Sequence, residues 1–345
     1  MSTAPTTRAR RHYGRWLPIV AMIVLIIALG AYTHGKQPQF TSSFNLNGLL
    51  QGTIPLALAA LAQASALMVK AFDVSVGALI TVCMVVTSFV VTEGHGWWQL
   101  ILGMLFVLGV ALLVGTANVV MIRGLKLSSI IATLATYSIL QGIALSLRPQ
   151  PAGKISTKFI HVILAKVGFM PVAFIVIVAI AIAADIWLYR TPGRLAARAA
   201  GLDDEAAKRR GVRVNYLFVR AFFISAFAAG VGGLFLAAHL ETGDPEAGFP
   251  LTLTGIAAAV LGGASLLGGR GSFIGAIVGA LFLNLIINVL PFLGWTTPQG
   301  DIMVGVLTLV ALSFYQAPEL MKRVRTSIAN FRLSRARAGT FAEKA

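Results

Sequence analysis

Long apolar runs dominate the chain, and polar residues gather between them. A helix needs about 20 apolar residues to cross a bilayer core, so runs near this length predict membrane-spanning helices. The predicted spans are residues 16–32, 49–69, 74–91, 97–122, 127–147, 167–189, 216–240, 251–267, 273–293 and 302–315. The pattern therefore predicts an all-α membrane protein with about ten transmembrane helices.

Basic residues are concentrated in every second segment between these spans. If the N-terminus is cytoplasmic, the segments on that side carry 23 Lys and Arg residues and the opposite segments carry five. The positive-inside rule then predicts that both termini lie in the cytoplasm. The expected organisation is a basic N-terminus (1–15), a transmembrane domain (16–316) with a cytoplasmic loop at 190–215, and a basic tail (317–345).

Composition supports this class and excludes several others. Hydrophobic residues make up 57% of the chain and charged residues 12%, about half the charged share of a soluble domain. The net charge of +16 is explained by membrane orientation and contact with lipid headgroups, so we expect no nucleic-acid partner. One cysteine and five scattered histidines predict no disulfide and no metal site. Neither Gly-Lys pair precedes Ser or Thr, so we expect no ATP site of the Walker type and no cofactor.

Acidic residues are rare at membrane depth. Only Asp73, between the second and third spans, and Asp185, near the end of the sixth, lie there. Ion-coupled transporters and membrane-embedded enzymes usually need more such groups, so both classes are disfavoured. Because Arg220 lies at a similar depth to Asp185, an ion pair between them is one hypothesis.

Uncharged polar residues recur at helical spacing within two spans. In the fifth span and the ninth span the candidates are Thr133, Thr136, Tyr137, Gln141, Asn284 and Asn288. Such side chains suit a path for a neutral, hydroxyl-rich solute, because they exchange hydrogen bonds without holding it by charge. The alternative is hydrogen bonding between helices, worth about 0.6 kcal/mol each.

The cytoplasmic loop contains an acidic-to-basic run at residues 203–210, which suits the helix dipole. Gly201 before this run and Gly211 after it are typical helix stops. The sequence therefore predicts one short cytoplasmic helix. The loop at 148–166 is predicted to lie on the opposite side.

Three motifs resemble the ribose-type sugar permeases of bacterial ABC importers. They are the Asp-Val-Ser-Val-Gly run at 73–77, the run at 130–135 that opens the fifth span, and the glycine-rich run at 262–272. The motif residues of the first and third runs are Asp73, Ser75, Gly77, Gly262, Gly263, Gly269 and Gly271. Family members commonly carry two glycines shortly before the aspartate, where this chain has Lys70 and Ala71, and an arginine is frequent where Gln141 stands.

The resemblance implies a type II ABC importer permease of the bacterial inner membrane, which is not itself an enzyme. It implies a second permease subunit, identical or paralogous, separate ATPase subunits below and a periplasmic sugar-binding protein above. The run 201–211 looks like the family's coupling segment, with Gly201, Asp204, Glu205, Ala206, Ala207 and Gly211 as its candidate residues. Ala206 and Ala207 would permit close approach of the ATPase.

The same motif residues have structural interpretations. Asp73 has the chemistry of an N-cap for the third span, and Gly271, Gly275 and Gly279 would let a second helix approach closely. We therefore expect the permease subunit of an ABC importer for a monosaccharide or polyol. The alternatives are a permease for branched-chain amino acids or nucleosides and, less favoured, a stand-alone secondary transporter.

Overall fold

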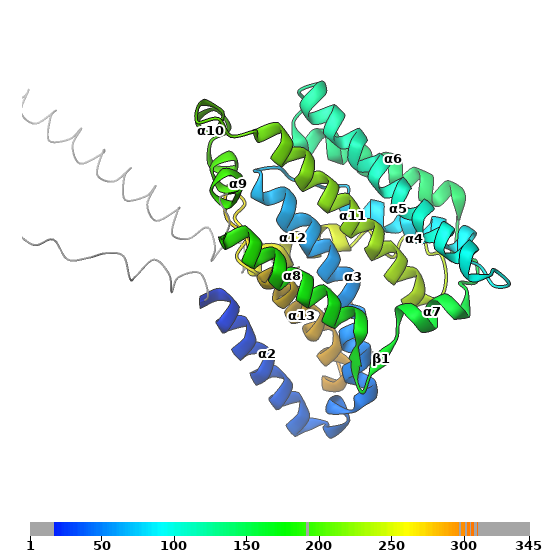
Figure 1. Cartoon of the computed structure of the whole chain (residues 1–345). Coiled ribbons are helices and arrows are strands. Elements are labelled where there is room, and N and C mark those ends of the chain that lie inside the picture. The colour runs from blue at the N-terminus through cyan, green and yellow to red at the C-terminus, as the bar shows by residue number, and fades with distance from the viewer. Residues whose placement is uncertain are drawn as a thin grey trace, which may run out of the picture.

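The computed structural model describes residues 17–190, 193–296 and 298–300, together with 302, 303, 305, 306 and 309. Figure 1 shows a bundle of helices in this part of the chain. The helices are α2 (Leu17–Lys36), α3 (Ser43–Met68), α4 (Val76–Val90), α5 (Trp97–Val119), α6 (Ser129–Leu147), α7 (Thr157–Ile163), α8 (Val172–Arg190), α9 (Gly193–Leu202), α10 (Asp204–Arg209), α11 (Val214–Leu240), α12 (Leu251–Leu261) and α13 (Phe273–Val289). Short 3-10 turns, η1 (Pro38–Thr41) and η3 (Leu290–Leu293), a π-helical turn, η2 (Val120–Gly124), and a hairpin of β1 (Lys166–Val167) and β2 (Met170–Pro171) complete it.

The predicted all-α membrane protein is confirmed. Six of the described helices are long and apolar enough to cross a membrane, and α4, α8 and α12 are shorter apolar helices. These nine correspond to the first nine predicted spans. The eighth was predicted to reach residue 267, but α12 ends at Leu261 because Gly262 and Gly263 follow it. The tenth predicted span, 302–315, lies almost entirely outside the described residues.

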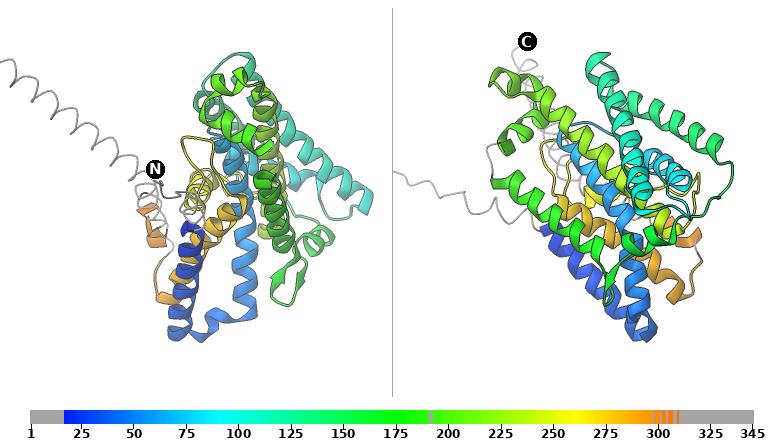
Figure 2. Two further views of the ribbon diagram at one scale, coloured as in Figure 1. Left: turned by 60° about the vertical axis from the view of Figure 1, so that its left-hand side comes forward. Right: turned by 45° about the vertical axis from the view of Figure 1, so that its right-hand side comes forward.

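Two helices form the centre of the bundle. The apolar stretches of α3 and α11 are 78% and 72% buried, whereas that of α2 is 17% buried. Alanines are frequent along α3, and small side chains let neighbouring helices approach closely in a membrane. Figure 2 shows α2 at the edge of the bundle, where its apolar side chains suit lipid.

The connections between helices fall into two groups at opposite ends of the bundle. At one end, the segment before α7 pairs with the segment after α11 through two backbone hydrogen bonds between Ala152 and Gly243. At the other end, the α12–α13 loop donates from Gly269 N to Met68 O at the end of α3, over 3.1 Å. Figure 1 shows α7 and α10 at these two ends.

Candidate functional site

The first feature is a break in the helical path between α3 and α4. Helix α3 ends where Lys70 adopts a left-handed conformation (φ 57°), with Ala71 N donating to Ala66 O over 3.1 Å. Residues 69–75 then run as non-helical and mostly buried backbone between these two apolar helices. Such backbone is tolerated only where protein groups satisfy its hydrogen bonds.

Asp73 supplies some of those hydrogen bonds and is itself almost fully buried. One carboxylate oxygen accepts from Ser75 N (3.2 Å) and Ser75 Oγ (2.6 Å), and the other accepts from Ser225 Oγ (2.8 Å) on α11. The N-cap of α4 is Ser75, two residues after Asp73. Asp73 therefore accepts a hydrogen bond from a backbone amide at the start of α4, as expected, but it does not occupy the N-cap position.

The polar face of α6 supplies further partners to this break. Thr133 Oγ1 accepts from Val74 N over 3.0 Å and donates to Ser129 O over 2.7 Å. Thr136 Oγ1 donates to Asn118 Oδ1 over 2.6 Å, and the Asn118 amide donates to Ser75 Oγ over 2.9 Å. Both threonines are buried, so these contacts favour the helix-packing interpretation for them.

Tyr137 and Gln141 lie farther along α6 and are only half-buried. The Tyr137 ring lies 5.7 Å from the Phe249 ring, just before α12. Of the polar residues on α6, these two therefore remain the stronger candidates for contact with a solute.

The N-terminal ends of α4 and α12 meet beside this face of α6. Gly77 N in the first turn of α4 donates to Thr252 Oγ1 in the first turn of α12 over 3.0 Å. A Cβ atom at Gly77 would collide with Thr252 and with Gly248 O, so only glycine permits this approach. At 1.5 Å per residue the helices are about 22 Å and 17 Å long, shorter than the bilayer core of about 30 Å. Broken helices whose N-termini meet inside the membrane form the substrate sites of many transporters.

The ninth-span candidates, Asn284 and Asn288, are half-buried and form hydrogen bonds with α3. The Asn284 amide donates to Leu49 O (2.9 Å) and Thr53 Oγ1 (3.0 Å). Asn288 and Asn45 exchange two side-chain hydrogen bonds of 3.1 Å. These bonds are the interhelical contacts that the sequence left open as an alternative.

Asp185 on α8 stabilises the start of α13. Its carboxylate accepts from Ser272 Oγ (2.6 Å), Phe273 N (2.9 Å) and Ile274 N (3.2 Å). The hypothesis of an ion pair with Arg220 is wrong, because Asp185 and Arg220 form no salt bridge within the part of the chain that the structure describes. The Arg220 guanidinium instead lies 4.3 Å from the centre of the Trp187 ring.

The glycine-rich motif forms close backbone contacts. A Cβ atom at Gly262 would collide with the backbone of Gly275, and one at Gly279 with Ala258, so α12 and α13 pack closely as expected for these two positions of α13. Gly271 lies before α13 and does not share its helical face. Gly263 has a left-handed φ of 95°, which favours glycine.

Helix α9, in the loop predicted at 190–215, contacts this motif. Gly269 O accepts from Arg198 Nε on α9 over 3.2 Å. A Cβ atom at Gly201 would collide with Met68 O and Gly269 N. Gly201 is therefore not a helix stop: it lies inside α9, where its missing side chain allows α9 to contact the end of α3 and the α12–α13 loop.

The short helix predicted between Gly201 and Gly211 is present as α10, but the helix that precedes it, α9, was not predicted. There are two helices, α9 and α10, and Asp203 between them caps α10 by accepting from Glu205 N and Ala206 N over 3.0 Å each. Gly211 ends the turn after α10 with a φ of 78°.

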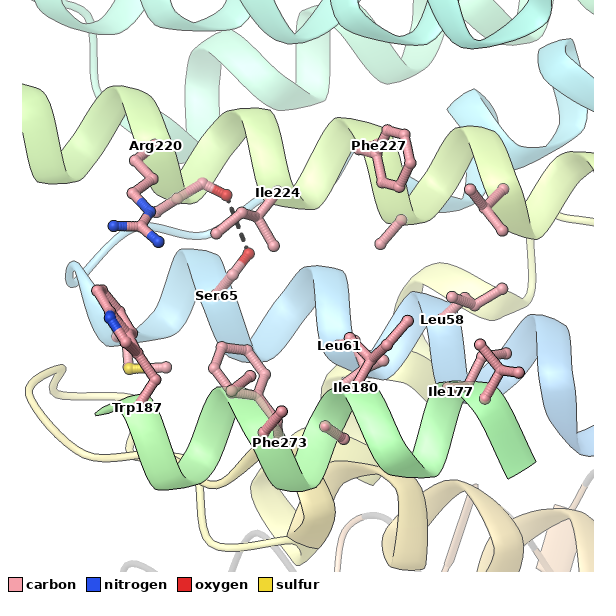
Figure 3. Close-up of a pocket in the computed structure, with 18 of the residues that line it drawn as sticks. Leu58, Leu61, Ser65, Ile177, Ile180, Trp187, Arg220, Ile224, Phe227 and Phe273 are labelled. Atoms are coloured by element: carbon pink, nitrogen blue, oxygen red, sulfur yellow. Dashed lines mark hydrogen bonds between the residues drawn. The ribbon is translucent and has the colours of Figure 1, made fainter. Parts of the chain in front are cut away.

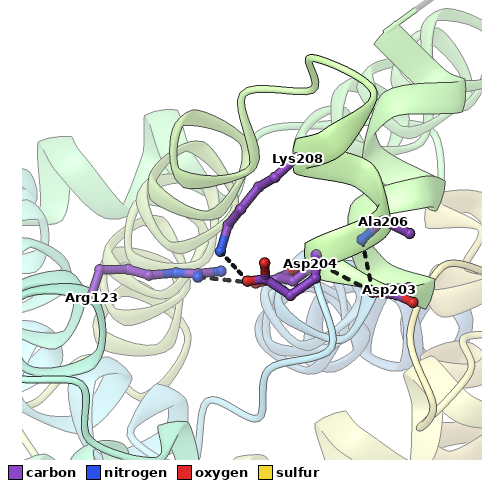
Figure 4. A network of polar contacts seen from close by, with 6 residues as sticks. Arg123, Asp203, Asp204, Ala206 and Lys208 are labelled. Atoms are coloured by element: carbon purple, nitrogen blue, oxygen red, sulfur yellow. Dashed lines mark hydrogen bonds and ion pairs between the residues drawn. The ribbon is translucent and has the colours of Figure 1, made fainter.

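Figure 4 shows how α10 is held to the bundle. Asp204 forms an ion pair with Arg123 over 3.1 Å, and Lys208 donates to Glu205 over 2.8 Å, which holds the pKa of the exposed Glu205 carboxylate below its ordinary value. Ala206 is exposed, but Ala207 is buried against Ala200 and Val214 of its own chain. The expectation that both alanines face a partner therefore does not hold for Ala207.

Several residues of these contacts were missed in the sequence. Asn118, Arg123, Ser225 and Thr252 each have a hydrogen-bond partner on another segment, 43 or more residues away in the sequence. The only sign of them in the sequence is that a polar residue lies in or beside an apolar span, and this does not identify the residue that it contacts.

The sequence was also compared with known proteins. A family profile described as "Branched-chain amino acid transport system / permease component" matches residues 45–312. The autoinducer 2 import system permease protein LsrC of Enterobacter sp. (strain 638) is 30% identical over 314 residues, covering 89% of this chain and 87% of that protein. The ribose import permease protein RbsC of Haemophilus influenzae is 28% identical over 316 residues, covering 87% and 93%. No solved structure matches the chain.

Proposed function

The chain belongs to the family of branched-chain amino acid transport system permease components, and from this membership we propose that it is the membrane-spanning subunit of an ABC importer for a monosaccharide or related polyol. The family consists of transport permeases, so the chain is not an enzyme. The observation that carries the proposal is the likeness, over most of the chain, to permeases named for import of ribose and autoinducer 2.

The proposed solute path passes the junction of α4 and α12 and the half-buried side chains of Tyr137 and Gln141. Helix N-termini, an amide and a phenol offer hydrogen bonds without a full charge, which suits a neutral hydroxylated solute. Asp73 is buried, and both of its carboxylate oxygens accept hydrogen bonds from Ser75 or Ser225. Its proposed part is therefore to hold the start of α4 in place beside the path.

Uptake in the host tests the solute class. Deletion of the gene is expected to abolish uptake of one member of a radiolabelled panel of pentoses, hexoses, polyols and autoinducer 2, and the intact gene should restore it. A Gln141→Ala gene should restore membrane abundance but not normal uptake. Loss of leucine uptake instead would favour the second candidate, a branched-chain amino acid permease. The description of the matching family supports this candidate.

Energy would reach the permease through α9 and α10 on its cytoplasmic face, from a separate ATPase subunit. The exposed side of this pair offers Leu202, Glu205, Ala206 and Lys208, a small apolar centre with charged neighbours. Such a surface suits docking into a groove of a soluble protein. The remaining proposed partners are a second permease subunit and a periplasmic solute-binding protein.

Ala206→Trp tests this surface better than a change at Ala207, because the Ala207 side chain packs inside the permease. The variant is expected to insert normally and to lose both uptake and solute-stimulated ATP hydrolysis. Phe169→Trp, an exposed position in the hairpin at the other end of the bundle, is the matched control and should keep both. Normal ATP hydrolysis in Ala206→Trp would remove α10 from the coupling surface.

The proposed location is the bacterial inner membrane with both termini in the cytoplasm. In a Cys83→Ala background, external thiol reagents should label cysteines introduced at 148–166 and 241–249. They should not label cysteines at 193–211. The contact between Ala152 and Gly243 supports a common side for the first two segments, and labelling at 193–211 from outside would refute the orientation.

A further inference from the structure

An apolar groove runs between α8 and α11, with α3 as its floor. Its volume is about 680 Å³. Figure 3 shows Ile177 and Ile180 of α8 facing Ile224 and Phe227 of α11 across it. Ile180 and Phe227 are 60% and 50% exposed, so the groove is open toward the surrounding membrane.

One end of the groove carries its single charge. Arg220 and Trp187 lie together there, at the ends of α11 and α8 that the proposed topology assigns to the cytoplasm (Figure 3). The other polar lining side chain, Ser65, donates to Ala62 O and Ala221 O. Within the described part of the chain Arg220 forms no ion pair with a carboxylate, since Asp185 is hydrogen-bonded to the start of α13.

We propose that this groove binds one anionic phospholipid of the cytoplasmic leaflet, with an acyl chain against α3 and the phosphate at Arg220. From Ile177 to Trp187 the groove follows α8 for about 15 Å, which equals half the thickness of a bilayer core. A lipid of one leaflet therefore matches both its length and the place of its charge. Tryptophan and arginine together are typical of the interface where headgroups lie.

A second copy of the chain fits the groove less well. A protein occupant would cover Arg220 and would need to bring a carboxylate to the same depth. The acidic residues at membrane depth in this sequence are Asp73 and Asp185, and both are hydrogen-bonded inside their own chain. A phospholipid brings its negative charge to this depth without such a residue.

Fluorescence quenching by brominated lipid tests the proposal, because Trp187 lies at the charged end. The full chain would retain Trp187 as its only tryptophan, after Trp16, Trp97, Trp98 and Trp295 are changed to Phe, and would be reconstituted in brominated phosphatidylcholine. Added unbrominated phosphatidylglycerol should relieve quenching with about fivefold higher affinity than unbrominated phosphatidylcholine. Arg220→Gln should bring this ratio close to one.

Two further variants separate the groove from the general membrane surface. Arg213→Gln removes an equal charge just before α11, outside the groove lining, and should keep the fivefold preference. Ala184→Phe fills the groove beside Trp187 and should reduce quenching by brominated chains. Equal affinity for both lipids, a preference that survives Arg220→Gln, or unchanged quenching in Ala184→Phe would each refute the proposal. So would a Trp187 signal that brominated lipid does not quench while a variant with Trp98 alone is quenched, because a protein would then occupy the groove.

Discussion

The contact between Asp185 and the start of α13 allows a quantitative test of how this bundle is held together. A carboxylate in a membrane span is costly unless its oxygens are occupied. Asp185 is 6% exposed and accepts from one hydroxyl and two backbone amides at the positive end of α13. The same amides would otherwise lack partners, because the first turn of a helix has no internal acceptors.

Asp185→Ala removes all three hydrogen bonds at once. Leaving a buried donor without a partner costs about 1–3 kcal/mol, and loss of the negative charge at the helix N-terminus costs about 1 kcal/mol more. Part of the loss is recovered, since Ser272 Oγ still accepts from Gly275 N over 3.1 Å and a buried charge has been removed. We expect a net destabilisation of about 3 kcal/mol, and about half of that for Asp185→Asn, which keeps one oxygen acceptor.

The chain contains its own reporter for this measurement. Cys83 is the single cysteine and is fully buried, so a dye that fluoresces on reaction with thiols reports unfolding in detergent. The apparent Tm of Asp185→Ala should fall by about 6 °C, if 1 kcal/mol corresponds to roughly 2 °C. Arg220→Gln should have a small effect that adds to that of Asp185→Ala. If Arg220→Gln alone costs as much, and the double variant costs no more than either single one, the two residues are an ion pair and the reasoning is wrong.

Three further predictions use the same thermal assay. Lys70→Gly should raise the Tm, because a left-handed residue other than glycine costs about 1 kcal/mol; a lower Tm would contradict this. Gly201→Ala should lower the Tm and the uptake together, since its Cβ atom would collide with backbone, whereas Gly142→Ala, with nothing within 4 Å, should do neither. The hydrogen bonds from Thr157 hold the pKa of Glu93 below its ordinary value of 4.5. The Glu93 carboxylate therefore stabilises α7 fully above pH 4.5, and this stabilisation is lost as the pH falls through the lowered pKa. The acid-induced loss of Tm should therefore be smaller in Glu93→Gln, and an unchanged pH profile would refute the contact.

Helix positions were predictable from the sequence because the length of an apolar run determines whether a helix can cross a bilayer. The main error in a span concerned α12. The apolar run continues to residue 267, but the helix ends at Leu261, since Gly263 adopts a left-handed conformation. Hydropathy records how apolar a residue is and contains no information about backbone conformation.

The site was less predictable because its contacts join distant segments. The polar stripe of α6 fitted both a solute path and a packing surface, and only the three-dimensional position of Val74 and Asn118 shows that Thr133 and Thr136 have protein partners. Likewise Asp185 acts 87 residues away, on Ser272. A sequence pattern identifies which face of a helix is polar, but the identity of its partner depends on the tertiary fold.

Gly201 shows why a glycine that allows close packing can be mistaken for one that ends a helix. Glycine commonly ends helices, so the sequence favoured a stop at this position. In the structure it instead allows backbone-to-backbone contact among α9, the end of α3 and the α12–α13 loop. Under the proposed coupling role this matters, because a contact between backbones contains no flexible side chain that could absorb a displacement. Movement of α9 would then act directly on Met68, the last residue of α3, five residues before Asp73 and the buried polar contacts at the start of α4.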